Sequence, residues 1–187
     1  MANSDFDQET LLTAGDIEHK LRRIAHEILE RSPDDRPLAI VGIQTRGVPL
    51  ADRIRAIIAS QREVLTGTLD ISLYRDDLDN LGTIPSIKGS DIPFEADGCH
   101  IVLVDDVLFT GRTIRAALDA LLDYGRPACV ELAALVDRGN RELPIAASYL
   151  GHEVHTTRED YVKVRLAETD PDEPEAALLL RRRGGKD

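Results

Sequence analysis

Short apolar runs that alternate with helical patterns constrain the fold of this chain most. The runs 38–43 (LAIVGI), 100–107 (HIVLVDDV) and 129–137 (CVELAALVD) are typical of strands that are buried on both faces. Apolar residues recur at helical spacing in the segments 13–31, 47–60 and 111–125. Strands that alternate with helices form a mainly parallel sheet flanked by helices, so the sequence predicts an α/β fold.

The remaining segments give the expected domain organisation. A chain of 187 residues is expected to fold as one domain with a sizeable core. Residues 1–10 are polar and expected to be loose, residues 11–180 form the domain, and residues 181–187 form a basic tail that is more often solvated than bound to nucleic acid. Further strands are expected at 66–74, 148–154 and 161–166.

Composition excludes several classes of protein. A net charge of −11 disfavours a general nucleic-acid binder, although a local basic patch is compatible with it. The two cysteines, Cys99 and Cys129, fit neither a zinc pattern nor a disulfide framework, and are expected to be reduced. No signal peptide or membrane-spanning apolar run is seen, so a cytoplasmic protein without membrane contact is expected.

The ends of the three buried runs indicate where a ligand binds. In open α/β sheets, ligands bind beyond the carboxyl ends of the parallel strands. The sequence therefore directs attention to the loops after Ile43, Val104 and Val136.

The stretch VLVDDVLFTGRT carries the most specific chemistry. A strand end is followed by two acids, Asp105 and Asp106, and then by a loop that contains Thr110, Gly111 and Thr113 and opens a helix. Free N–H groups at a helix start bind phosphate, whereas ionised carboxylates accept hydrogen bonds from sugar hydroxyls and favour positive charge on a sugar ring. Paired acids can also simply cap a turn. The order of strand, acids, loop and helix favours a phosphorylated ribose.

This stretch resembles a known signature, and other segments narrow the resemblance. Residues 102–114 are similar to the phosphoribosyl-pyrophosphate (PRPP) signature of the type I phosphoribosyltransferases. The segments that resemble the PyrR family, pyrimidine operon regulators that are also uracil phosphoribosyltransferases, are 42–51, 70–78, 87–93 and 135–145. The resemblance extends over about residues 12–166.

The resemblance implies a fold and a reaction. The fold is a single-domain type I phosphoribosyltransferase, with a flexible lid loop at about 74–93 and a small hood at about 137–166 that has N-terminal contributions. The reaction converts uracil and PRPP to UMP and pyrophosphate. Mg²⁺ is implied as a cofactor that arrives with PRPP, and the protein is expected to supply no direct metal ligand.

The resemblance also implies roles for individual residues. Asp105 and Asp106 hold the ribose hydroxyls, and Arg46, in a pyrophosphate loop that often contains a cis peptide in the superfamily, completes the catalytic set. The lid contacts are Tyr74, Arg75 and Lys88, whose charges are otherwise simply solvated. The implied PRPP and nucleotide contacts are Thr45, Arg46, Gly47, Asp105, Asp106, Val107, Leu108, Phe109, Thr110, Gly111, Arg112, Thr113, Arg138 and Val162, the last beside Tyr161 in the hood over uracil.

A regulatory role is the second implication. Members of the family bind an mRNA stem-loop of the pyrimidine operon with UMP as corepressor and a guanosine nucleotide as antagonist, and they form homo-oligomers, dimers or higher. The implied RNA contacts lie on the first helix, which on charge pattern alone is an ordinary solvated face with interleaved glutamates. These contacts are His19, Arg22, Arg23, His26 and Arg31.

Three positions depart from the family pattern. Asn140 stands where many relatives have His, and Ala146 and Ala147 stand where relatives often carry Arg and an acid.

The alternatives that remain are a uracil phosphoribosyltransferase that has lost RNA binding, a phosphoribosyltransferase for hypoxanthine, orotate or xanthine, and a catalytically weak sensor of UMP.

Overall fold

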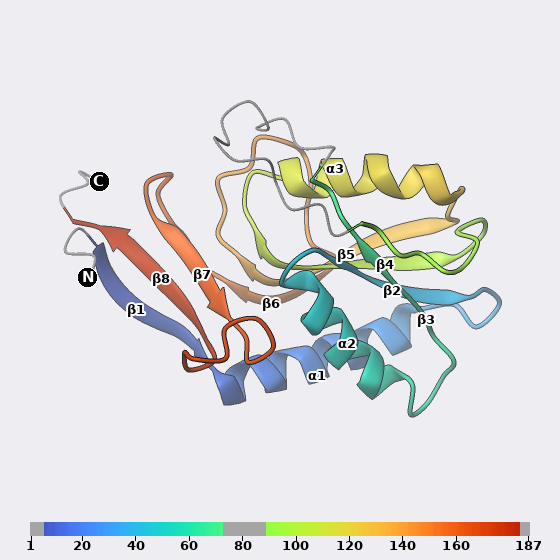
Figure 1. Cartoon of the computed structure of the whole chain (residues 1–187), viewed down its shortest axis with the longest axis horizontal. Coiled ribbons are helices and arrows are strands. Elements are labelled where there is room, and N and C mark those ends of the chain that lie inside the picture. The colour runs from blue at the N-terminus through green and yellow to red at the C-terminus, as the bar shows by residue number, and fades with distance from the viewer. Residues whose placement is uncertain (1–5, 73–88, 184–187) are drawn as a thin grey trace.

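The computed structural model describes residues 6–72 and 89–183. Its centre is a sheet of five parallel strands in the order β3-β2-β4-β5-β6 (Figure 1). The predicted α/β class is confirmed. The strands are β2 (Leu38–Ile43), β3 (Leu65–Leu69), β4 (His100–Leu108), β5 (Cys129–Asp137) and β6 (Tyr149–Glu153).

Helices cover both faces of this sheet (Figure 1). The helices are α1 (Ala14–Arg31), α2 (Gly47–Ile58) and α3 (Arg112–Leu121), which continues into the 3₁₀ turn η2 (Leu122–Tyr124). Ile40 and Val102 pack in the core with α1 and α2, whereas Val41 and Ile101 pack in the core with α3. Successive strand side chains thus alternate between two apolar cores, which explains why the runs are apolar throughout. No helix of the described ranges is long and apolar enough to cross a membrane.

The start of α1 shows why the first helix lies where its sequence pattern predicts. The Thr13 hydroxyl and the Asp16 carboxylate form a capping box, in which each side chain accepts a hydrogen bond from the other residue's N–H. Ile17, Leu21 and Ile28 are buried at helical spacing. The cap and the apolar stripe together determine both the start and the orientation of the helix.

The order of the strands creates the place for a ligand. α2 follows β2 on one face of the sheet, and α3 follows the adjacent strand β4 on the other face. The loops after β2 and β4 therefore diverge at the carboxyl end of the sheet. This is a topological switch point, where open α/β sheets bind ligands.

A second, three-stranded antiparallel sheet corrects the expectation for both chain ends. The small sheet has the order β1-β8-β7 and consists of β1 (Phe6–Thr13), β8 (Ala176–Arg182) and β7 (Tyr161–Arg165). Residues 6–10 are thus paired rather than loose, and the first two residues of the expected basic tail belong to β8. The small sheet takes only β7 from the expected 137–166 hood. The sequence did not predict β1 because its residues are largely polar and because its partner, β8, is distant in sequence.

Other elements differ slightly from the prediction. The expected 66–74 strand ends at Leu69, where the buried Asp70 accepts hydrogen bonds from the N–H groups of Ser72 (2.9 Å) and Gly89 (3.1 Å). β4 ends at Leu108, one residue after the expected run 100–107, so the two acids lie on the strand as that run predicts, and the loop expected after Val104 begins only after Leu108. Residues 73–88, which include most of the expected lid, lie outside the described residues.

Exchange of Gly42 for alanine tests how closely α2 approaches β2. A Cβ atom at Gly42 would lie 2.6 Å from Val48 Cα and 2.8 Å from the Gly47 carbonyl oxygen, both backbone atoms. We expect Gly42→Ala to lower the free energy of unfolding in urea by about 2–3 kcal/mol. Gly15→Ala is the control, because a Cβ there meets nothing closer than 4.0 Å. It should stabilise the helix by up to about 1 kcal/mol. Equal effects of the two exchanges would contradict the close approach.

Candidate active site

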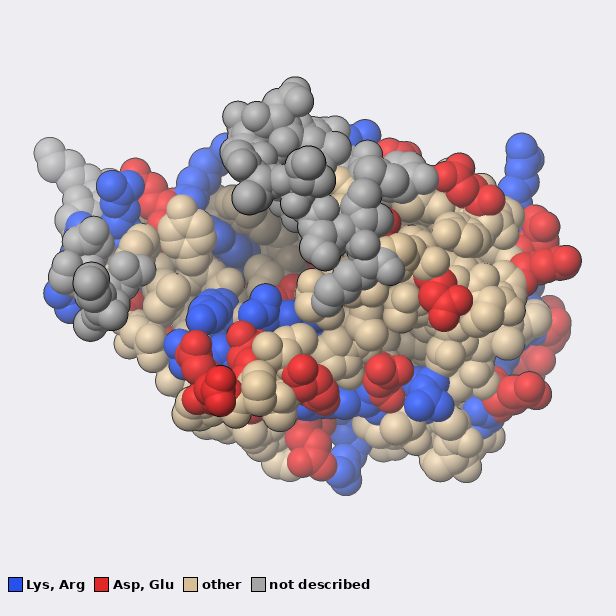
Figure 2. Space-filling view, in the orientation of Figure 1, with Lys and Arg blue, Asp and Glu red and all other residues tan. Residues whose placement is uncertain are grey.

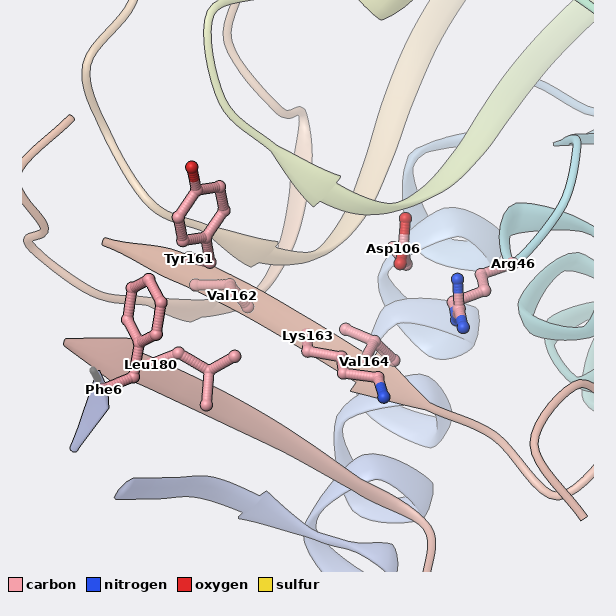
Figure 3. A pocket seen from close by; sticks show the side chains of 8 residues that line it. All are labelled: Phe6, Arg46, Asp106, Tyr161, Val162, Lys163, Val164 and Leu180. Carbon is pink, nitrogen blue, oxygen red and sulfur yellow. The ribbon is translucent and has the colours of Figure 1, made fainter. Parts of the chain in front are cut away.

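Two adjoining cavities open at the carboxyl end of the central sheet. The smaller cavity, of about 280 Å³, is lined by Thr45, Arg46, Asp105, Asp106 and Thr113, among others. The larger, of about 490 Å³, lies between this site and the small sheet (Figure 3). Arg46 and Asp106 line both cavities. Figure 2 shows the hollow on this face, with basic side chains inside it and acidic side chains along its rim.

The loop after β2 brings Arg46 into this crevice. The Gln44–Thr45 peptide is cis, as the resemblance implied for this loop. Thr45 and Arg46 line the smaller cavity, whereas Gly47 packs against β4. A Cβ atom at Gly47 would collide with the Val104 carbonyl oxygen, so only glycine lets the loop lie directly against the strand that carries the two acids.

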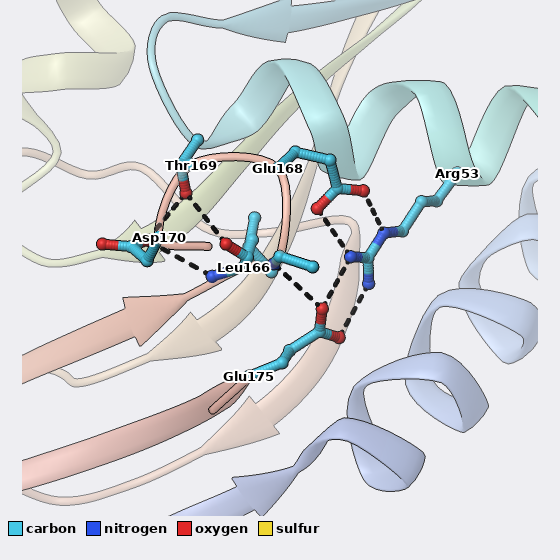
Figure 4. Close-up of polar contacts among 7 residues, drawn as sticks. Arg53, Leu166, Glu168, Thr169, Asp170 and Glu175 are labelled. Atoms are coloured by element: carbon cyan, nitrogen blue, oxygen red, sulfur yellow. Dashed lines mark hydrogen bonds and ion pairs between the residues drawn. The ribbon is translucent and has the colours of Figure 1, made fainter. Parts of the chain in front are cut away.

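Arg46 has a carboxylate partner that sequence reasoning missed. Its Nη2 donates to Asp170 at 2.9 and 3.2 Å from the two carboxylate oxygens, and its Nε is buried without a partner among the described residues. Asp170 also accepts from the Thr169 hydroxyl (2.7 Å) and the Leu166 N–H (3.3 Å) (Figure 4). The Thr169 hydrogen bond, followed by Arg46, lowers the pKa of Asp170 to about 2. No pattern distinguished Asp170 from its acidic neighbours in the sequence.

An ion-pair clamp holds the loop that carries Asp170. Arg53 of α2 donates to Glu168 at 2.7 and 2.9 Å and to Glu175 at 2.7 and 2.8 Å (Figure 4). The hydrogen bonds that Arg53 donates to Glu175 and Glu168 raise the pKa of Arg53 and lower the pKa of both carboxyls. Arg46 and Arg53 flank the first two turns of α2, so this one helix fixes the β7–β8 loop at two points.

The two acids of β4 differ in their surroundings. Asp105 is buried, and its carboxylate accepts a hydrogen bond from the Asp106 N–H at 3.0 Å. Asp106 reaches both cavities, and burial raises the pKa of its carboxyl, against the opposing effects of the Asp105 hydrogen bond and the Arg46 charge. A cation developing in the crevice would favour the ionised form of Asp106.

The loop after β4 has the geometry of an anion site. Gly111 has a φ of +92° and precedes the first residue of α3, so the loop turns sharply into the helix N-terminus. Val107 and Thr113 line the smaller cavity, whereas Leu108 is buried in the core. The Arg112 side chain turns outward and donates to Glu142 at 2.8 Å.

Arg138 is buried and contacts the protein rather than either cavity. Its guanidinium stacks over the Phe109 ring at 3.9 Å and donates to Thr156 Oγ1 (3.2 Å) and the Thr157 carbonyl (2.9 Å). Only 5% of Arg138 is exposed, and this burial lowers its pKa. Arg138 lines neither cavity, so its direct contact with a nucleotide stays a prediction. Val162, by contrast, lines the larger cavity beside Tyr161 and Lys163 (Figure 3).

The remaining expectations concern the lid contacts and the metal ion. Tyr74, Arg75 and Lys88 lie outside the described residues. The described ranges contain no cluster of three or more His, Cys, Asp or Glu side chains that could hold a metal ion. The two carboxylates in the polar cavity are nevertheless of the kind that Mg²⁺ prefers when a substrate and water supply its other ligands.

The five residues of α1 that were expected to contact RNA are all exposed, and the three arginines among them also contact the protein. Arg22 pairs with Glu18 at 2.8 Å, and Arg23 pairs with Glu27 and donates to carbonyl groups of β6. Arg31 donates to the Ser148 carbonyl at 3.0 Å. His19 and His26 share the exposed face without a hydrogen bond to other described residues.

Comparisons with known sequences identify the family of the chain. A family model described as a phosphoribosyl transferase domain matches residues 7–167. The "Bifunctional protein PyrR" of Deinococcus deserti is 51% identical over 163 residues, which cover 86% of this chain and 89% of that protein. The protein of the same name from Thermus thermophilus is 54% identical over 162 residues, or 86% of this chain and 90% of that protein.

Solved structures show the fold independently. A hypoxanthine phosphoribosyltransferase from Staphylococcus aureus superposes with a TM-score of 0.68 and 20% identity, covering 98% of this chain and 97% of that one. A hypoxanthine phosphoribosyltransferase from Trypanosoma cruzi gives a TM-score of 0.69 at 18% identity, covering 94% and 97%. At these identities the likeness concerns the fold.

The pairing of Asp170 predicts a pH-dependent contribution to stability. The pKa of Asp170 falls from 3.8 to about 2 on folding, so its contribution is present above about pH 4 and is lost as the pH falls through 2. Asp170→Asn should lower the free energy of unfolding at pH 7 by about 2 kcal/mol, with the difference from wild type vanishing near pH 2. Denaturant unfolding between pH 2 and 7 measures this. The control is Asp172→Asn, at an exposed acid of the same loop, and a deficit that persists at pH 2 would contradict the pairing.

Proposed function

Because the chain belongs to the PyrR family of phosphoribosyl transferases, we propose that it converts uracil and PRPP to UMP and pyrophosphate and regulates a pyrimidine operon by binding its mRNA. One observation supports the transferase reaction most directly. Arg46 and Asp106 line both the polar cavity and the neighbouring larger cavity. A reaction at the junction of two ligands requires this arrangement, because the leaving group and the attacking base must meet at one carbon.

PRPP fits the smaller cavity part by part. The 5′-phosphate binds the loop from Thr110 to Thr113, where the start of α3 supplies N–H donors and the positive end of a helix dipole. The ribose hydroxyls donate to Asp105 and Asp106. The pyrophosphate binds beside Thr45 and Arg46, on the loop that Gly47 allows to lie against β4.

The reaction then proceeds by charge stabilisation. As the C1′–O bond to pyrophosphate lengthens, the ribose gains oxocarbenium character and the leaving group gains negative charge. Asp105 and Asp106 place carboxylates beside the developing cation, and Arg46 binds the departing anion. Mg²⁺ entering with PRPP supplies further charge neutralisation at the pyrophosphate. Uracil N1 attacks C1′ from the opposite face, and its positioning contributes much of the acceleration.

Uracil fits the larger cavity beside β7. Within the described residues β7 is an edge strand that pairs with β8 alone, so backbone N–H and C=O groups on its other side are available to a ligand. β7 borders the larger cavity (Figure 3). Uracil presents an N3–H donor between two carbonyl acceptors, which such a backbone edge can match. Tyr161 and Val162 supply an apolar wall for the ring.

The enzymatic assignment predicts a base preference and a dependence on Arg46. In steady-state assays with uracil, hypoxanthine, orotate and xanthine, we expect turnover with uracil to dominate. Arg46→Ala should lower kcat with uracil about 100-fold or more, because the leaving pyrophosphate loses its cation. UMP binding by calorimetry should change little, since UMP carries no pyrophosphate. Preference for a purine would refute the uracil assignment, and an unchanged kcat in Arg46→Ala would refute the role of Arg46 at the leaving group. Negligible turnover by wild type that still binds UMP would indicate a sensor of UMP instead.

The regulatory half of the proposal is supported by the exposed face of α1. His19 and His26 lie on this face with Arg22 and Arg23, in a chain that is otherwise strongly acidic. We propose UMP as the corepressor, since the transferase product occupies the same crevice.

Asn140, at a position where many relatives carry His, donates to the Thr156 carbonyl at 2.8 Å and thereby supports a loop.

Filter binding with a pyrimidine-leader RNA tests this half separately. We expect the RNA to bind in the presence of UMP and to bind much more weakly without it. The double exchange of His19 and His26 for alanine should weaken RNA binding about tenfold, through lost phosphate and base contacts, while leaving uracil turnover unchanged. The matched control is Glu30→Ala, at an exposed position of the same helix. Absence of UMP-dependent binding at low salt would leave a transferase without RNA regulation.

A further inference from the structure

Two successive carbonyl groups of the phosphate loop are turned toward the segment 139–145. The Phe109 carbonyl accepts a hydrogen bond from Arg141 Nη1 at 2.6 Å. The next carbonyl, of Thr110, accepts from the N–H groups of Glu142 (3.0 Å) and Leu143 (3.1 Å). The segment after β5 therefore holds the outer side of the loop through its backbone oxygens.

This arrangement determines where the amides of the loop point. In a trans peptide the N–H lies opposite the preceding C=O, so holding the Phe109 and Thr110 carbonyls outward turns the N–H groups of Thr110 and Gly111 the other way. None of the described residues accepts a hydrogen bond from these two amides. Successive free N–H groups of this kind form a concave site for an anion.

Each guanidinium nitrogen of Arg141 donates to the protein, and Nη1 is the one that reaches the phosphate loop. Nε donates to the Ile145 carbonyl at 2.8 Å, Nη1 donates to Phe109 and, at 3.3 Å, to the Gly139 carbonyl, and Nη2 pairs with Asp137. Asp137 is the last residue of β5 and also accepts from the Gly139 N–H at 2.9 Å. The planar fork thus ties the phosphate loop to the end of a central strand, which a lysine cannot reproduce.

We propose that Arg141 is a positioning residue for the 5′-phosphate of the substrate, and that it acts by fixing the orientation of the Phe109–Thr110 peptide. This inference rests on the proposed transferase function. It assigns Arg141 a role apart from the cations of the crevice, because its donors are already occupied by protein and it lines neither cavity. Without Arg141 this peptide can rotate and withdraw one N–H from the phosphate.

A nearby arginine provides a matched control. Arg158 pairs at 3.1 Å with Glu142, the residue that follows Arg141, but its side chain is 67% exposed and reaches no carbonyl of the phosphate loop. Exposed pairs of this type contribute little to stability. Arg158→Gln therefore removes the same charge from the same neighbourhood without releasing the Phe109–Thr110 peptide.

The test compares Arg141→Gln, Arg141→Lys and Arg158→Gln with wild type. By calorimetry, Arg141→Gln should bind UMP about tenfold more weakly, the effect of one lost oriented hydrogen bond to a charged group. In steady-state assays its KM for PRPP should rise while its KM for uracil stays the same. Arg141→Lys, which retains the Asp137 pair, should show a smaller loss of the same kind and serves if Arg141→Gln fails to fold. Arg158→Gln should match wild type.

Three results would overturn the proposal. They are UMP affinity in folded Arg141→Gln within about twofold of wild type, an equal rise in KM for both substrates, and an equal loss in Arg158→Gln. An equal rise would indicate a merely structural role. The calorimetric arm does not need turnover. If wild type forms no UMP from uracil and PRPP, the proposed function fails, whereas the comparison of UMP affinities still decides the role of Arg141.

Discussion

The direct backbone contact between the start of α2 and the strands β2 and β4 is the constraint on which the site depends. Gly42 and Gly47 have no side chain where α2 meets the sheet, and a Cβ atom at either position would strike backbone atoms. This approach places Arg46 next to Asp106 at the mouth of the two cavities. The same helix, through Arg53, then holds the loop whose Asp170 pairs with Arg46. The glycine contacts and the Arg53 ion pairs therefore both fix the position of α2.

Local patterns predicted the central layer well because each buried strand carries its own signal. The strands β2 and β5 begin and end where the apolar runs predict, since a strand covered on both faces is apolar throughout. The two acids and the Gly-Thr loop were likewise recognisable, because consecutive residues supply the chemistry. The strands β1 and β8 were missed because they pair across almost the whole length of the described chain. The residues near Phe6 carry no local signal of a partner as distant as Arg182.

The supporting residues of the site were missed for a related reason. Asp170 and Arg141 act through contacts with residues far away in the chain, Arg46 and Phe109, and each stands in a segment with other charged residues. A sequence shows that an arginine is present but not which carbonyl its fork will reach. Arg138, for which the resemblance implied a nucleotide contact, is buried and stacks over Phe109, and no local pattern predicts that packing.

The small sheet also bears on how the protein is made. β8 lies between β1 and β7, so β1 has no partner in the small sheet until residues 176–182 have been synthesised. Phe6 and Leu180, at opposite ends of the chain, both line the larger cavity. A nascent chain can therefore assemble the central sheet and its polar crevice first. The lining of the larger cavity is completed only after β8 has been synthesised, so a chain that stops before Ala176 lacks part of that lining.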